Sequence, residues 1–238
     1  MSDITQRFST GVPQNLEERF ASRAAHMKPS EIRSLFAVAS RPEIVSLAGG
    51  MPNLSALPMG MMADVVNNLV RNNGQEALQY GNGQGHPKLR EQICEVMALE
   101  GIRANPDDVL ITTGSQQALD LISRIFLDPQ DVVLVEAPSY VGALGTFHQY
   151  EAAVVHVETD ENGLVPAALA EAIKSVRAAG RKIKFLYTIP NYQNPSGVLL
   201  PAARRTEILS ICREAGIFVV EDNPYGLLGF DKPSPNAM

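Results

Sequence analysis

Short apolar runs alternate with helix-like segments between residues 108 and 222. The runs have the length and apolar content of buried strands, and they cover residues 108–113, 131–137, 152–158, 183–190 and 216–222. Segments with helical character lie between them, at about residues 115–127, 139–149, 166–179 and 201–215. Strands that are apolar throughout and alternate with helices are typical of a parallel sheet covered on both faces. The pattern therefore predicts an α/β fold with a mostly parallel sheet and helices on both faces.

The first hundred residues follow a different pattern, which predicts an N-terminal helical arm before the sheet. Residues 29–40 have an amphipathic helical pattern with Ser30 at the N-cap position. Residues 43–53 resemble a strand that enters a glycine turn. Two further helices are predicted at about residues 58–72 and 87–100, with the glycine-rich loop ALQYGNGQGHP between them.

Charge and cysteine content narrow the class of protein. The formal net charge of −6 and the pI near 5.3 argue against a general nucleic-acid binder, which needs a basic face for phosphates. The N-terminal stretch MSDITQRFSTG has no apolar core for a signal peptide, and no apolar run approaches the ~20 residues that span a bilayer. The two cysteines lie far apart in helix-like patterns, which favours free thiols in a reducing compartment. We expect a cytoplasmic protein, and the histidines lack the spacing of a zinc site.

Open parallel sheets bind ligands beyond the carboxyl ends of their strands, so the residues at the strand ends are the candidates for binding and catalysis. The first predicted strand ends in TTGSQQAL, where Ser115 and Gln116 open a helix. Backbone N–H groups and the helix dipole at such a start bind anions, and the Ser115 hydroxyl adds a donor. An ordinary serine N-cap explains the same residues equally well. The sequence GxxxxGK[ST] is absent, so this is not a P-loop.

Two further strand ends carry Tyr140 and Asn194. Tyr140 follows its strand in EAPSY, where its ring either stacks on a flat ligand or packs on the sheet. Asn194 lies in PNYQNPSG, a turn whose asparagines, prolines and glycine specify the backbone tightly and permit a cis peptide before Pro195. This density of special residues favours a functional turn that presents the Asn194 amide to a ligand oxygen.

The last predicted strand ends in VVEDNPYG. An apolar strand that ends in acids also holds magnesium in P-loop ATPases, but the phosphate-binding lysine motif of that class is absent here. Asp222 is better explained as the partner of a protonated ring nitrogen, and Tyr225 as a donor to an oxygen on the same ring. Glu221 receives no role. The strand ends together offer a phosphate site, an aromatic ring, an amide, a phenol and a carboxylate, which suit pyridoxal 5′-phosphate.

The motifs TTGSQQAL, EAPSY, PNYQNPSG and VVEDNPYG, in this order, closely resemble fold-type I pyridoxal-phosphate-dependent aminotransferases of classes I and II. The resemblance is greatest to the branch with 2-aminoadipate and kynurenine aminotransferases, and it runs from about residue 19 to the end. It implies a cofactor site with Ser115 and Gln116 at the phosphate, Tyr140 over the pyridine ring, Asn194 and Tyr225 at the 3′-oxygen, and Asp222 at the ring nitrogen.

The resemblance also implies a homodimer with shared active sites, whereas the acidic charge and the lack of a long apolar run predict no nucleic-acid or membrane partner. Tyr80, in ALQYG, matches the family tyrosine that reaches the cofactor phosphate of the neighbouring subunit. Gly50 matches a position against the substrate. Ser30 and Arg33 match a mobile N-terminal helix that closes over substrate side chains. Arg33 suits a distal carboxylate through a bidentate pair, and a solvated helix face explains it nearly as well.

The Schiff-base lysine of the family has no counterpart in this sequence. The family places it in a serine-rich segment a few dozen residues after the aspartate, and none of the lysines here lies in such a context. The arginine for the substrate α-carboxylate has no counterpart either. We therefore expect residues 1–57 to form an arm and part of a small domain, and residues 58–238 a pyridoxal-phosphate-binding large domain truncated before the lysine. This fragment alone is expected to be inactive.

The full-length protein is expected to transfer an amino group between an amino acid, 2-aminoadipate-like or of broad range, and a 2-oxo acid. Two alternatives stay open. The first is a pyridoxal-phosphate-sensing domain of a transcription regulator, although only about forty residues precede SLAGG and they are not basic enough for a DNA-binding module. The second is a lyase or decarboxylase reaction, because a fold does not fix its chemistry.

Overall fold

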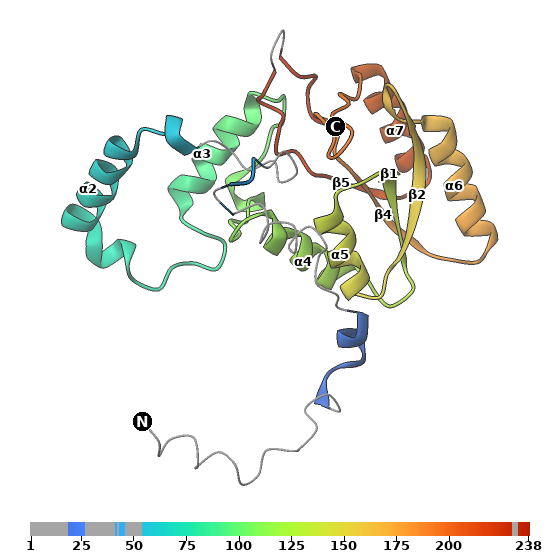
Figure 1. Cartoon of the computed structure of the whole chain (residues 1–238), viewed down its shortest axis with the longest axis horizontal. Coiled ribbons are helices and arrows are strands. Elements are labelled where there is room, and N and C mark those ends of the chain that lie inside the picture. Colours follow the sequence, from blue (N-terminus) through green and yellow to red (C-terminus); the bar gives the residue numbers. More distant parts are fainter. Residues whose placement is uncertain (1–18, 27–40, 42, 46–53, 230–232) are drawn as a thin grey trace.

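The computed structural model describes residues 19–26, 41, 43–45, 54–229 and 233–238 (Figure 1). Within these residues the central sheet has five strands in the order β3-β2-β1-β4-β5. The strands are β1 (Val132–Ala137), β2 (Ala153–Asp160), β3 (Gly163–Leu164), β4 (Ile183–Thr188) and β5 (Phe218–Glu221). All pairings are parallel except that of the short β3 with β2. The predicted mostly parallel sheet is confirmed, and β3 was not predicted.

Helices cover both faces of the sheet, as the alternating pattern predicted. Helices α4 (Ser115–Phe126) and α5 (Val141–Gln149) pack on one face, and α6 (Pro166–Ala178) and α7 (Ala202–Glu214) pack on the other (Figure 1). Two of these helices begin at or directly after a proline, α6 at Pro166 and α7 after Pro201, and the fixed φ of proline suits the start of a helix. The layers leave the strand ends as the accessible edge of the sheet.

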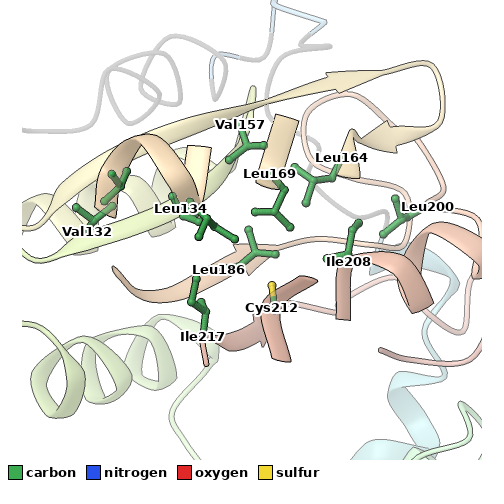
Figure 2. Packing of buried hydrophobic residues seen from close by; sticks show 12 residues of the cluster. Val132, Leu134, Val157, Leu164, Leu169, Leu186, Leu200, Ile208, Cys212 and Ile217 are labelled. Carbon is green, nitrogen blue, oxygen red and sulfur yellow. The ribbon is translucent and has the colours of Figure 1, made fainter. Parts of the chain in front are cut away.

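Successive residues of each strand pack into opposite layers. In β1, Val132 and Leu134 join the cluster on the α6 and α7 side, whereas Val133 and Val135 join the cluster on the α4 and α5 side. Figure 2 shows the first cluster, where Leu134 lies among side chains from the sheet and its covering helices. Burial of each such valine or leucine contributes about 1.5–3 kcal/mol. Burial on both faces is the reason that the central strands β1 and β4 are largely apolar.

Helices α2 (Met59–Ala77) and α3 (Pro87–Ala98) lie outside these layers. None of the residues of α2 is buried, and the helix lies apart from the sheet in Figure 1. Arg90 of α3 is buried and donates to the Pro106 carbonyl at 2.7 Å, which ties α3 to the 3₁₀ turn η4 (Pro106–Asp108). Two further 3₁₀ turns are η2 (Ser22–His26) and η3 (Leu54–Ala56).

The predicted strand at residues 108–113 is wrong. Asp108 ends η4, and the residues after it form neither strand nor helix until Ser115. The Ile111 backbone N–H donates to the Gln84 carbonyl at 2.9 Å, and no described strand lies beside this segment. A strand needs a neighbouring strand to pair its backbone groups. An apolar run carries no information on whether that neighbour exists.

The predictions for the N-terminal arm are only partly covered by the structure. The helix expected at residues 29–40 lies outside the described residues, as do residues 46–53 of the expected strand. Residues 43–45 are described and form a turn and irregular backbone. The expected domain boundary at residue 57 stays a prediction. Among the described helices, none is both long enough and apolar enough to cross a membrane.

Candidate functional site

Three strand carboxyl ends lie side by side, because β4 pairs in parallel with β1 on one side and with β5 on the other. The loops that follow these ends carry Tyr140, Asn194 and Asp222. Thr188, the last residue of β4, joins its two neighbours: its hydroxyl donates to Glu136 Oε1 of β1 at 2.7 Å, and its carbonyl accepts from the Asp222 backbone N–H at 2.9 Å. Three of the predicted site residues therefore follow strand ends that are tied together.

Glu221 and Asp222, the two acids at the end of β5, lie on opposite faces of the sheet, because successive side chains of a strand alternate between its faces. Asp222 accepts a hydrogen bond of 2.6 Å at Oδ2 from the Tyr187 hydroxyl, whose ring packs on the α5 side. Glu221 lies with Cys212 of α7, and its Oε2 accepts from the Met238 backbone N–H at 2.8 Å. Burial raises the pKa of the Glu221 carboxyl. Asp222 thus belongs to the candidate site, and Glu221 belongs to the packing of the opposite face.

Tyr187 is a site residue that the sequence did not reveal. Its side chain is fully buried, and its ring lies edge-on to Phe147 with centroids 5.5 Å apart and an interplanar angle of 75°. Burial, followed by the bond to Asp222, raises the pKa of Tyr187, so the hydroxyl remains a donor at neutral pH. In the sequence FLYTIP, Tyr187 cannot be told from any aromatic residue of a core. Only the register between β4 and β5 identifies Asp222 as its partner.

Glu136, at the end of β1, is a second residue that sequence reasoning missed. Its carboxylate is 2% exposed and accepts hydrogen bonds from the Thr188 hydroxyl, the Ile189 backbone N–H and Gln193 Nε2. Burial raises the pKa of Glu136, and the three hydrogen bonds act in the opposite direction. The sequence did contain a sign of the role of Glu136, because an acid within the apolar run VVLVEA requires hydrogen-bond donors that are buried with it.

The turn after β4 presents Asn194. The peptide bond before Pro195 is cis, as the sequence of the turn permitted. Gln193 closes the turn, since its side-chain Oε1 accepts from the Ser196 backbone N–H at 2.8 Å. Asn194 is half-buried, and its side-chain amide forms no hydrogen bond with any residue that the structure describes. Its amide therefore remains available to a ligand.

A chain of side-chain hydrogen bonds connects the turn after β4 with the turn after β5. Arg205 of α7 donates to Asn191 Oδ1 at 2.6 Å, and Asn191 Nδ2 donates to Asn223 Oδ1 at 2.8 Å. Asn223 in turn donates to Glu100 Oε1 at 2.7 Å. Arg205 and Asn191 are buried, where hydrogen bonds are strong and water does not compete. The turns that carry Asn194 and Asp222 are thus held relative to each other by side chains as well as by strand pairing.

Tyr140 lies at the start of α5, and its ring depends on a glycine. A Cβ added to Gly142 would lie 2.5 Å from Tyr140 Cζ and from the phenol oxygen. The Tyr140 ring can occupy this position because residue 142 is a glycine and has no Cβ. The neighbouring Ser139 hydroxyl is buried and has no hydrogen-bond partner among the described residues. Tyr225 is half-buried in the turn after β5.

The start of α4 has the features of an anion site. Gly114 precedes it with φ 73°, and no atom lies within 4 Å of the position that a Cβ would take. Ser115 and Gln116 are exposed, and the first turn holds no acidic residue. Gln116 Nε2 donates to Thr146 of α5 at 2.5 Å, which ties the two helices together. The unpaired N–H groups of the first turn suit a phosphate.

The remaining predicted site residues do not follow the ends of β1, β4 and β5 or lie outside the described residues. Tyr80 follows α2 and is 99% exposed. Ser30, Arg33 and Gly50 lie outside the described residues. No described lysine follows a strand carboxyl end, and Lys184, for example, forms an ion pair with an aspartate ahead of β1.

The groups of the candidate site could together contact one ligand. They comprise a helix start, an aromatic ring, an unbonded amide, a phenol and a carboxylate whose Oδ1 accepts no hydrogen bond from the described residues. These groups suit a flat ligand with an anionic substituent, an oxygen and a protonated ring nitrogen. The described histidine, cysteine, aspartate and glutamate side chains form no group of three that could hold a metal ion.

Comparison with known proteins gives consistent matches. The family model described as aminotransferase class I and II matches residues 43–238. The chain is 38% identical over 215 residues to aromatic-amino-acid aminotransferase 1 of Thermococcus litoralis, covering 90% of this chain and 52% of that protein. It is 40% identical over 218 residues to the 2-aminoadipate transaminase of Thermus thermophilus, covering 92% of this chain and 52% of that protein.

A solved structure agrees with these matches. The crystal structure of the kynurenine aminotransferase of Pyrococcus horikoshii in complex with PMP superposes with a TM-score of 0.86 and 38% identity, covering 94% of this chain and 55% of that chain. The chain spans about half the length of the curated relatives that it matches.

Proposed function

The chain belongs to the class I and II aminotransferase family, and from this premise we propose that its protein uses pyridoxal 5′-phosphate to transfer an amino group between an amino acid and a 2-oxo acid. The observation that carries the proposal is the junction of β1, β4 and β5, where the Tyr140 loop, Asn194 and Asp222 follow neighbouring strand ends. An aromatic face, an amide and a carboxylate are the groups that the pyridine ring of this cofactor requires. The aminotransferase names of the relatives support the same reaction class.

Each residue of the candidate site has a proposed task toward the cofactor. Ser115 and Gln116 bind the phosphate at the start of α4, and Tyr140 covers the pyridine ring. Asn194 and Tyr225 donate to the 3′-oxygen, and Asp222 keeps the ring nitrogen protonated through Oδ1. When bound, the cofactor supplies an electron sink for the amino-acid substrate. The chain itself orients the ring and holds one proton at the ring nitrogen.

The amino donor is proposed to be 2-aminoadipate-like or of broad range. Gly50 is proposed to lie against the substrate, and Ser30 and Arg33 to close over its side chain. An arginine at this position would bind a distal carboxylate through a bidentate pair. The relatives support breadth as well as acidity, because one is named for aromatic amino acids and the other for 2-aminoadipate.

The active protein is proposed to be a homodimer with shared sites. The apolar side chains of α2 are exposed in the single chain, Val66 by 58% and Leu69 by 49%, and they lie on one side of the helix at three-residue spacing. Exposed apolar stripes of this kind are typical of an interface. Tyr80, 99% exposed just after α2, is proposed to reach the cofactor phosphate of the partner subunit.

The large domain is proposed to comprise residues 58–238, with residues 1–57 as an arm and part of a small domain.

A cytoplasmic location is proposed as well. It is supported by Cys94 and Cys212, which are both unpaired thiols, as a reducing compartment favours.

The full-length gene product tests the proposed function. It would be incubated with 2-oxoglutarate and a panel of acidic, aromatic and branched-chain amino acids, and glutamate formation would be measured. The expected result is glutamate from at least one donor and none from an Asp222→Ala variant. Cofactor binding without amino transfer from any donor would contradict the proposal. In that case, release of carbon dioxide or ammonia would indicate a decarboxylase or lyase, and no turnover at all would indicate a cofactor-sensing domain.

A further inference from the structure

The geometry of the turn that carries Asn194 depends on Gln193. The Gln193 backbone N–H donates to the Val198 carbonyl at 2.9 Å, and its carbonyl accepts from the Gly197 N–H at 2.5 Å. Its side-chain Oε1 accepts from the Ser196 N–H at 2.8 Å. Asn194 lies within the loop that these bonds close, and its own side chain has no hydrogen bond among the described residues. The backbone position from which the Asn194 side chain extends is therefore set by its neighbour.

The side-chain amide nitrogen of Gln193 is bound by Glu136. Gln193 Nε2 donates to Glu136 Oε2 at 3.3 Å and to the Pro138 carbonyl at 2.8 Å. The same Oε2 accepts from the Ile189 backbone N–H at 3.1 Å, and Oε1 accepts from the Thr188 hydroxyl at 2.7 Å. Glu136 is 2% and Gln193 5% exposed, so water does not compete for these bonds. One buried carboxylate thus joins the end of β1, the end of β4 and the turn after β4.

We propose that Glu136 is a positioning residue, whose carboxylate fixes Gln193 and thereby directs the Asn194 amide toward the 3′-oxygen of bound pyridoxal 5′-phosphate. The inference rests on the proposed function, since it concerns a residue that does not touch the cofactor. A valine or leucine at position 136 would continue the apolar pattern of β1 but would leave the Ile189 N–H buried without an acceptor. The same change would release Gln193 Nε2 from β1.

The acceptor geometry at position 136 matters more than the negative charge. A glutamine there keeps one oxygen for the two N–H donors at Oε2, and its amide N–H₂ donates to the Thr188 oxygen, since a hydroxyl donates or accepts according to its partner. An alanine provides no acceptor. Glu136→Gln, which keeps the hydrogen bonds and removes the charge, therefore separates hydrogen bonding from a requirement for the charge.

The experiment is a double-mutant cycle on cofactor affinity in the full-length protein. Pyridoxal 5′-phosphate is titrated into cofactor-free wild type, Glu136→Ala, Asn194→Ala and the double variant, and its absorption band is followed. Each single variant is expected to raise Kd about ten-fold, the value of one charge-assisted hydrogen bond. The double variant is expected to bind within about two-fold of Asn194→Ala, because Glu136 acts through Asn194. Glu136→Gln is expected within about two-fold of wild type.

A control variant and a substitute variant complete the experiment. Tyr225→Phe changes a donor on a different turn, so its effect on Kd should multiply with that of Glu136→Ala. If circular dichroism shows that Glu136→Ala does not fold, Gln193→Met takes its place, because it breaks the link to Glu136 together with the Gln193 bond to Ser196 and leaves the Thr188 and Ile189 bonds to Glu136 intact. A wild-type Kd for the folded variant, or effects that multiply with Asn194→Ala, would overturn the inference alone. A wild-type protein that does not bind the cofactor would overturn the proposed function and the inference with it.

Discussion

The Tyr187 hydroxyl donates a hydrogen bond of 2.6 Å to Asp222 Oδ2, across the boundary between β4 and β5. The donor is held in place, because its ring is fully buried and lies edge-on to Phe147. With Oδ2 engaged, Oδ1 is the Asp222 oxygen that accepts no hydrogen bond from the described residues. A protonated ring nitrogen would therefore meet a carboxylate whose orientation is already set, which reduces the ordering that binding requires.

Tyr187→Phe removes this hydroxyl and keeps the ring. We expect the free energy of unfolding to fall by about 2 kcal/mol, since the bond joins a buried donor to a charged acceptor. Urea denaturation measures this loss, and a titration with pyridoxal 5′-phosphate should show a higher Kd. Tyr150→Phe is the matched control, because the Tyr150 hydroxyl donates to Asp120 at 2.8 Å away from the strand ends. The control should lose stability without a change in cofactor Kd; equal effects of both variants on Kd would argue against a role for Tyr187 at the site.

Gly142→Ala is expected to separate stability from cofactor binding. The new Cβ would lie 2.5 Å from the Tyr140 ring, so the ring must move, while alanine favours a helix by up to about 1 kcal/mol over glycine. We expect an unchanged or higher melting temperature and a cofactor Kd raised about five-fold, the value of about 1 kcal/mol of aromatic stacking. Gly145→Ala, in the same helix and with no atom within 4 Å of its Cβ position, is the control and should leave Kd unchanged. Equal Kd values for the two variants would show that Tyr140 does not stack on the cofactor.

The sequence predicted the layers of the fold because burial on both faces leaves near-continuous apolar runs. The runs that became β1 and β4 show this directly, and their boundaries differ from the prediction by one or two residues. The run at residues 108–113 has a similar apolar content but no neighbouring strand in the structure. Strand formation depends on a partner that is remote in the chain, and local pattern does not report it.

Motif spacing predicted which strand ends carry candidate chemistry, and it did not reveal how they are held together. Tyr187 and Glu136 are positioned by the register between neighbouring strands, which single-strand patterns do not contain. Glu221 and Asp222 were indistinguishable as adjacent acids until strand alternation assigned them to opposite faces. The roles of the site residues toward a cofactor stay predictions that the variants above examine.

Glu221→Gln is expected to change the pH dependence of stability. Burial raises the pKa of Glu221 above its ordinary value of 4.5, so the folded state binds this proton more tightly than the unfolded state. The stability that this provides is present below that ordinary value and is lost as pH rises through the pKa of the folded state. Glutamine keeps the acceptor for the Met238 N–H and carries no charge. The variant should therefore gain stability relative to wild type as pH rises from about 5 to about 8.

Urea denaturation across this pH range measures the difference between Glu221→Gln and wild type. Glu207→Gln, on the exposed side of α7, is the matched control and should run parallel to wild type. A Glu221→Gln curve that also runs parallel would show that this carboxylate is not disfavoured in the folded state.

Val66→Glu tests the proposed interface on α2. The Val66 side chain is 58% exposed in the single chain, and a homodimer would cover it together with Leu69. A carboxylate at this position would be buried without a partner, which strongly disfavours association. We expect sedimentation to show a dimer for the wild-type full-length protein and a monomer for Val66→Glu, with unchanged helix content. Asn67→Glu adds the same charge one residue further on, toward the polar side of the helix, and should remain a dimer. A dimeric Val66→Glu protein would place the subunit contact elsewhere and would remove the support that α2 gives to a shared site at Tyr80.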